Sequence, residues 1–285
     1  MSKNPLQDYS DELNNLINQF KALKSGRVTY LEEESFEMLI DHFLENELAD
    51  EAFLAAQFGL EQHAQSARLM IKKADVLLVQ NKPEEALYIL NKSYLFDRTD
   101  PGFYILKTEA LLALDKQEEA ANLLETAIDF FEGDEKIELL FELTDVYDDY
   151  ENFDKVFDCL KFILAMQPTN EEALYRICFW TDMTGRNEEG IRLHQDIIED
   201  NPYCSLAWFN LGSAYQGIKL YEKAIDSYQY AVAIDEKFDY AYRNMADAFI
   251  RLRKYKEAID ALETVTELGR PESVILEAIG HCYDK

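Results

Sequence analysis

The chain repeats one pattern of large and small apolar residues with a period of 34 residues. The pattern is clearest in residues 205–238, where seven positions are large, large, small, aromatic, small, large and small in turn. Counted from Ser205 as position 1, positions 4, 7, 8, 11, 20, 24 and 27 hold Trp208, Leu211, Gly212, Tyr215, Ala224, Tyr228 and Ala231. Steps of three and four residues place the first four on one face of a helix and the last three on one face of a second helix. The pattern therefore predicts a helix–turn–helix unit.

The same frame extends along most of the chain. Shifting by 34 residues gives Tyr242, Met245, Ala246, Phe249, Ala258, Leu262 and Val265, the same classes in the same order. Because one helix pair cannot bury its own apolar face, such units must stack on their neighbours. We predict an all-α fold of seven stacked units: 33–66, 67–100, 101–136, 137–170, 171–204, 205–238 and 239–272. The third is longer by two residues, which we place in a turn around Gly133.

The two ends carry partial versions of this pattern. Residues 8–24 have an amphipathic helical pattern, so we expect 1–32 to be an N-terminal capping helix and linker, with a flexible leader as the alternative. Residues 273–285 place Leu276, Ile279, Gly280 and Tyr283 at positions 4, 7, 8 and 11. This is the first helix of an incomplete eighth unit, and we expect the chain to be part of a longer protein.

The residues quoted for 205–238 resemble the signature of the tetratricopeptide repeat family. The resemblance covers 33–272, with departures at Lys107 (position 7), Thr181 (position 11) and Gly190 (position 20). It implies a right-handed α-α superhelix, a solenoid whose first helices line a concave groove. It also implies that the protein binds other proteins or peptides and is not an enzyme.

In that family, positions 2, 5, 9, 12 and 13 of each unit face the groove. In this chain, these positions hold carboxylates and aromatic residues. Carboxylates accept Lys or Arg, and exposed aromatic residues serve as binding anchors. The predicted partner-binding residues are Glu37, Asp41, Glu45, Asp75, Glu109, Phe141, Asp145, Asp148, Tyr175, Phe179, Asp182, Phe209 and Ser213.

The charge balance narrows the class of partner. The chain has 56 acidic and 28 basic residues, a formal net charge of −28. Nucleic acids and anionic membranes bind positive surfaces, so neither is expected as a partner. A basic protein or peptide fits, and the alternative is a solvated surface that keeps the array soluble. Unit 33–66 carries nine acidic residues and no Lys or Arg, so we expect the N-terminal part of the groove to favour a basic partner.

Other chemistry leaves no clear pattern. The four cysteines form no C-x-x-C pair, the four histidines are far apart, and no phosphate-binding glycine motif occurs. We therefore predict no cofactor, no metal and no catalysis. The polar N-terminus and the lack of a long apolar run predict a cytoplasmic protein. The oligomeric state stays open. An alternative function is a regulatory or assembly region of a larger enzyme or signalling protein whose active part lies beyond residue 285.

Overall fold

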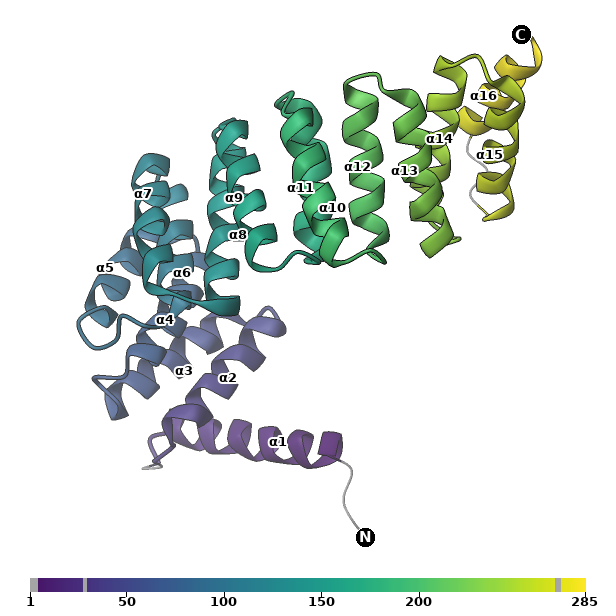
Figure 1. Ribbon diagram of the computed structural model, residues 1–285. Helices are drawn as coiled ribbons and strands as arrows, with labels where there is room; N and C mark the ends of the chain where they lie inside the picture. Colours follow the sequence, from purple (N-terminus) through teal and green to yellow (C-terminus); the bar gives the residue numbers. More distant parts are fainter. Residues whose placement is uncertain (1–4, 28–29, 270–272) are drawn as a thin grey trace. The chain divides into compact units, whose positions relative to one another are not determined.

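The computed structural model describes residues 5–27, 30–269 and 273–285, with side chains from Glu12 onward. Residues 1–4 and 28–29 of the predicted cap and linker, and residues 270–272 of the seventh predicted unit, lie outside these ranges. Every regular element in the described ranges is a helix (Figure 1). The chain divides into two compact units, Met1–Glu142 and Leu143–Lys285.

The first unit is a stack of helix pairs covered by an N-terminal helix. Its helices are α1 (Pro5–Lys24), α2 (Glu33–Glu45), α3 (Ala49–Gln62), α4 (Ala67–Val79), α5 (Pro83–Ser93), α6 (Pro101–Leu112), α7 (Gln117–Ala127), the 3-10 turn η1 (Ile128–Phe130) and the start of α8 (Gly133–Asp149). The α1 side chain of Phe20 is buried, with its ring 5.5 Å from that of Phe43. Helix α1 therefore closes an apolar face of the first pair.

The second unit continues the same arrangement. It contains the end of α8, then α9 (Phe153–Met166), α10 (Glu171–Met183), α11 (Asn187–Asp200), α12 (Ser205–Gly217), α13 (Tyr221–Ile234), α14 (Asp239–Arg251), α15 (Tyr255–Glu267) and α16 (Ser273–Tyr283). From α9 to α16 each helix contacts the next, and α10 also contacts α12, which in turn contacts α14 (Figure 1). The predicted all-α fold of stacked helix pairs is confirmed within each unit.

Side-chain caps set the start of several first helices. The side chains of Ser66, Asp100 and Asn170 accept hydrogen bonds from the backbone N–H groups of the first turns of α4, α6 and α10, at 2.8–3.0 Å. These oxygens satisfy donors that have no partner within the helix. The polar residue before each apolar run therefore marks where the helix begins.

Pairs of large and small residues hold the two helices of a unit together. Tyr228 is fully buried, and a Cβ placed on Gly212 would lie 2.6 Å from its ring. Only glycine at position 8 lets the aromatic ring at position 24 lie this close. Thr181 and Gly190, two departures from the repeat pattern, approach each other equally closely, because a Cβ on Gly190 would lie 2.7 Å from the methyl carbon of Thr181.

The turn inside each helix pair contains one residue in the left-handed backbone region. These residues are Glu47, Asn81, Asp115, Glu151, Gly185, Lys219 and Arg253, with φ between 56° and 68°. Each stands at position 15 of its predicted unit. A positive φ ends the first helix and starts the reversal, yet six of the seven residues carry a Cβ, which is unfavourable in this region.

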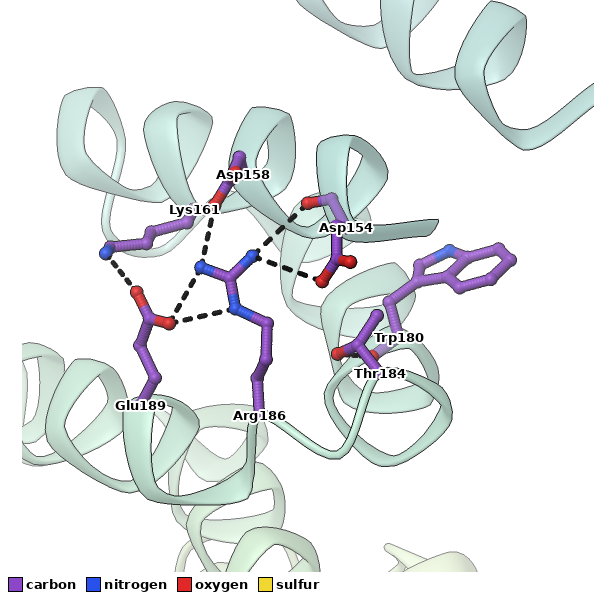
Figure 2. Close-up of polar contacts among 7 residues, drawn as sticks. All are labelled: Asp154, Asp158, Lys161, Trp180, Thr184, Arg186 and Glu189. Atoms are coloured by element: carbon purple, nitrogen blue, oxygen red, sulfur yellow. Dashed lines mark hydrogen bonds and ion pairs between the residues drawn. The ribbon is translucent and has the colours of Figure 1, made fainter. Parts of the chain in front are cut away.

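An arginine fixes the turn between α10 and α11. The Arg186 guanidinium lies 2.7 Å from both Asp158 and Glu189 and donates to the Asp154 carbonyl at 3.2 Å. Figure 2 shows these contacts, together with Lys161, which pairs with the same Glu189. The guanidinium also lies 4.1 Å from the centroid of the Phe157 ring. One side chain thus ties this turn to α9 and α11.

His194 occupies position 24 of its unit, where other units have a large apolar residue. It is 1% exposed, and neither ring nitrogen has a hydrogen-bond partner. Burial lowers the pKa of this imidazole to about 3, because its charged form would lose solvation. The histidine is therefore neutral in the folded protein.

We predict that Lys219→Gly stabilises the protein by about 0.5–1 kcal/mol. Glycine removes the strain that a Cβ causes at positive φ. The greater conformational entropy of the unfolded glycine chain offsets part of this stabilisation. Chemical denaturation measures the change. Lys256→Gly, within α15, is the matched control and should destabilise by about 1 kcal/mol. Equal effects of the two substitutions would contradict the assigned turn strain.

We predict that Arg186→Ala destabilises the protein by about 1–3 kcal/mol, through the loss of charge-assisted hydrogen bonds and the ring contact. Arg186→Lys should recover only part of this loss, because an ammonium cannot reproduce the planar fork of a guanidinium. Urea unfolding of the three proteins tests this. A lysine variant as stable as the wild type would show that charge alone matters at this turn.

We predict that His194 by itself lowers the free energy of unfolding by about 2 kcal/mol when the pH falls from 7 to 5. The folded-state pKa lies below the ordinary value near 6.5, so the unfolded chain binds a proton first as the pH falls. This contribution is present above about pH 6.5 and is lost on acidification toward pH 3. His194→Leu should lack it. Denaturation of both proteins at the two pH values isolates the effect, and identical pH dependence would refute it.

Candidate groove on the first helices of the second unit

The first-helix layer of the second unit contains an open hollow of about 490 Å³. Its lining comes mainly from the C-terminal halves of α10, α12 and α14, with Asn187 at the start of α11 and Tyr228 on α13. Phe179, Asp182 and Ser213 are predicted groove residues that line this hollow. The other predicted residues lie elsewhere on the first helices of the two units.

Helix α10 presents a row of exposed apolar side chains on this layer. Tyr175, Phe179 and Met183 follow one another at intervals of four residues and are 60%, 56% and 54% exposed. The opposite side of the helix, with Leu174 and Ile177, is fully buried. We call Tyr175, Phe179 and Met183 the α10 stripe. Sequence reasoning named its first two members, and Met183 stands at position 13, which also faces the predicted groove.

The wall formed by α12 is more packed than the sequence suggested. The Phe209 ring lies 4.9 Å from the Phe238 ring and 5.7 Å from the Tyr228 ring. Phe209 is therefore partly engaged in internal packing. The Ser213 hydroxyl lies 3.3 Å from the Tyr228 hydroxyl, so it forms part of the floor of the hollow.

A chain of hydrogen bonds connects α13, α12 and α14 at the floor. The Tyr228 hydroxyl donates to Gln216 Oε1 at 3.0 Å, and Gln216 Nε2 donates to Asp247 Oδ2 at 2.9 Å. Arg251 Nε lies 3.5 Å from Asp247 Oδ1. Burial raises the pKa of the Tyr228 hydroxyl well above its usual range, so the hydroxyl remains protonated and acts as the donor.

The thiol of Cys178 also lines the hollow. Burial raises its pKa to about 11, so the thiol is neutral at physiological pH. A neutral thiol is a poor nucleophile, and this cysteine therefore offers no activated group for catalysis. Among the described residues, none of the clusters of His, Cys, Asp and Glu could hold a metal ion.

The predicted carboxylates near the start of the second unit differ in their surroundings. Asp145 is exposed and forms an ion pair with Arg176, which also approaches Glu172 at 3.5 Å. Asp148 is half-buried, and Asp182 is exposed at the end of α10. The preceding aromatic, Phe141, is half-buried and belongs to the first unit.

The first unit has its own row of carboxylates on α2, α4 and α6. Lys72 lies 2.6 Å from Asp41. Burial raises the pKa of Asp75, with Lys72 opposing the shift and Asp41 adding to it. Burial also raises the pKa of Glu109, to which the charge of Asp75 contributes. The charge of Asp41 thus acts on Asp75 and that of Asp75 on Glu109, so this row attracts cations.

The two remaining predictions in the first unit have contrasting surroundings. Glu37 is half-buried, 4.0 Å from Arg68, and burial raises its pKa while Arg68 opposes the shift. Glu45 is exposed near the end of α2. Sequence reasoning treated this acidic segment in isolation and missed the cations that the next helix pair supplies.

A regular spacing of 31 residues connects these cross-helix contacts. It separates Asp41 from Lys72 and Asp145 from Arg176, and in both pairs position 9 meets position 6 of the next unit. At the hollow the same two positions hold Phe179 with Asn210, and Ser213 with Asn244. At the hollow, neutral residues thus occupy the two positions that form the ion pairs Asp41–Lys72 and Asp145–Arg176 in other units.

Asn187 is the residue of the hollow that sequence reasoning could not find. It begins α11, a second helix, whereas the predicted groove positions all belong to first helices. Its side chain is buried against Gly217, the last residue of α12. A contact between a second helix and the end of the next first helix has no signature in a single repeat.

None of the helices in the described ranges is long and apolar enough to cross a membrane. This finding agrees with the absence of a long apolar run in the sequence.

Comparison with known proteins identifies the repeat. A profile of the tetratricopeptide repeat matches residues 205–238. Anaphase-promoting complex subunit 3 of Schizosaccharomyces pombe is 30% identical over 100 residues, which cover 35% of this chain and 15% of that subunit. The aligned part is thus a small share of the relative's length.

A solved structure of a tetratricopeptide repeat protein shares the fold. The C-terminal part of such a protein from Cytophaga hutchinsonii has a TM-score of 0.59 at 12% identity, covering 86% of this chain and 99% of that one. A protein from Parabacteroides merdae has a TM-score of 0.44 at 16% identity, covering 88% and 99%. The profile match identifies residues 205–238 as a tetratricopeptide repeat, and the chain shares the fold of the Cytophaga hutchinsonii protein.

Proposed function

We propose that this chain is a protein-interaction scaffold that holds a peptide or a segment of a protein against the first-helix face, in an acidic and aromatic groove. The observation that carries the proposal is the α10 stripe beside the 490 Å³ hollow. Three large apolar side chains in one row on a solvated helix suit a protein partner, because contiguous exposed apolar surface marks interaction sites.

The surroundings of the stripe suit a peptide more than a small molecule. The hollow combines apolar side chains with amides, hydroxyls and carboxylates from three neighbouring first helices. Apolar anchors supply affinity, and the polar groups supply direction by pairing with a peptide backbone or with polar side chains. The acidic residues Asp145, Asp148 and Asp182 favour a partner with basic residues.

The acidic row of the first unit extends this proposal to a second part of the chain. Lys72 attracts Asp41 and Asp75, whereas Asp75 is repelled by Asp41 and by Glu109. A partner that brings further positive charge would relieve this repulsion. The partner-binding set predicted from the sequence thus remains a proposal for both units, with the hollow as its best-defined part.

A second candidate is a role in the assembly of a multi-subunit complex. It is favoured by the matched relative, which is a subunit of such a complex. The two candidates differ in the surface they use, because a groove takes a short segment whereas assembly uses an extended surface of several helices.

We predict that Tyr175→Ala/Phe179→Ala weakens binding of a captured partner by about tenfold or more, since truncating anchor residues typically costs more than 1.4 kcal/mol. A pull-down from native cell extract, followed by titration of the recovered protein, measures this. Both residues are exposed, so circular dichroism should show an intact fold.

The matched control is Phe162→Ala/Tyr203→Ala, which removes two exposed aromatic residues from α9 and from the loop after α11. It should leave the affinity unchanged. A partner lost by the control variant and kept by the stripe variant would move the function to the second-helix side and favour the assembly role.

A further inference from the structure

We infer that the hollow of the second unit receives a lysine or arginine side chain of the partner, with its stem along Phe179 and Met183 and its charged head at Asp182 and Asn187. This inference rests on the proposed function and specifies which chemistry the groove recognises. The folded chain leaves one hydrogen-bond acceptor in the lining of this hollow unused.

Asn187 is 6% exposed, and its Oδ1 atom has no hydrogen-bond partner. A buried carbonyl oxygen without a donor is unfavourable, and such groups require an explanation. The amide belongs to the lining of the hollow. A donor from a bound partner would satisfy it.

The position of Gly217 shows where this oxygen points. A Cβ on Gly217 would lie only 2.4 Å from Asn187 Oδ1, so the oxygen occupies the space into which a side chain at residue 217 would project. Residue 217 stands at position 13 of its unit, which faces the predicted groove. The unused acceptor is therefore aimed at the groove, and glycine is the residue that leaves it room.

The charges at this end of the hollow favour a cation. Asp182 is exposed in the last turn of α10, and Gly217 ends α12. Both helices present their C-terminal carbonyl groups here, which carry partial negative charge. The second carboxylate of the hollow, Asp247, is already engaged by Gln216 and Arg251.

The α10 stripe supplies the apolar half of the site. Phe179 and Met183 line the hollow on either side of Asp182 in the sequence, and both are more than half exposed. Lysine and arginine carry long aliphatic stems that pack on apolar surfaces while their heads reach polar groups. An aromatic ring beside the head would add a cation–π contribution. A shorter or anionic side chain would use fewer of these features.

The hollow also contains two cations of its own, Lys219 and Arg251. They offer the opposite chemistry, in which a carboxylate of the partner would bind between them. Arg251 is paired with Asp247, so the cationic ligand is the better match. The experiment below separates the two signs of charge directly.

The test selects binders from a displayed library of random twelve-residue peptides, using the whole chain as bait. The selected peptides are synthesised, and their affinities are measured by fluorescence anisotropy. We expect a consensus of Lys or Arg next to a large apolar residue. Asp182→Asn should weaken these peptides by about three- to tenfold, as expected for a partly exposed charged contact. The control Asp196→Asn, which removes an exposed charge on α11, should not.

A double-mutant cycle shows whether the basic side chain meets this site. Replacing it in the peptide by norleucine should weaken binding to the wild type. The same replacement should have a much smaller effect on Asp182→Asn/Asn187→Leu, because contacting groups are energetically coupled. Asn187→Leu keeps the side-chain volume, and Asp182→Asn alone provides the measurement if the buried substitution unfolds the chain.

The outcomes distinguish the inference from the proposed function. The inference is overturned if the selected peptides need the α10 stripe but have no basic consensus or an acidic one. It is also overturned if their affinity is unchanged by Asp182→Asn. In these cases the proposed groove still stands. Selected peptides that bind equally well to Tyr175→Ala/Phe179→Ala overturn both, as does a library that yields no binder.

Discussion

The close approach of the two helices in each pair is the constraint on which the structure depends. A helix pair of this length buries apolar surface only if its axes come near enough for side chains to interlock, and a small residue opposite a large one permits this. The contact between Gly212 and the Tyr228 ring is the clearest case, with no room for even a methyl group. The Thr181 and Gly190 pair meets the same constraint with the glycine on the second helix, because a Cβ on Gly190 would lie 2.7 Å from the methyl carbon of Thr181.

The groove follows from this packing. Position 24 is occupied by a tyrosine in 205–238, and its hydroxyl donates to Gln216 and lies 3.3 Å from the Ser213 hydroxyl, both on α12. A core residue thereby organises the floor of the hollow. In this unit, position 9 and position 6 of the next repeat hold neutral residues. The two pairs are Phe179 with Asn210 and Ser213 with Asn244. Where those positions carry opposite charges, as in Asp145 with Arg176, the first helices are cross-linked and less of their surface is free for a partner.

The sequence predicted the parts of this structure that depend on the repeat period. Six of the seven pattern positions of 205–238 are buried in α12 and α13, and Trp208 is half-buried; Tyr175 and Phe179 are exposed on α10. The period could not predict contacts between units, because these depend on how neighbouring helices align. The spacing of 31 residues between Asp41 and Lys72 recurs between Asp145 and Arg176. With that offset in hand, both ion pairs could have been found from the sequence.

Asn187 lies outside even this rule, because it joins the start of a second helix to the end of the following first helix. Its placement depends on the turn before it, where Arg186 is held by Asp158 and Glu189 (Figure 2). These ion pairs of Arg186 fix the backbone immediately before Asn187 and so help to hold its unused acceptor against Gly217. Groups that serve binding are often kept in an unfavourable state by surrounding structure that is stable enough to bear the cost. In this chain the ion-paired turn provides that support, and the position of a potential binding group is set by residues that the partner would never contact.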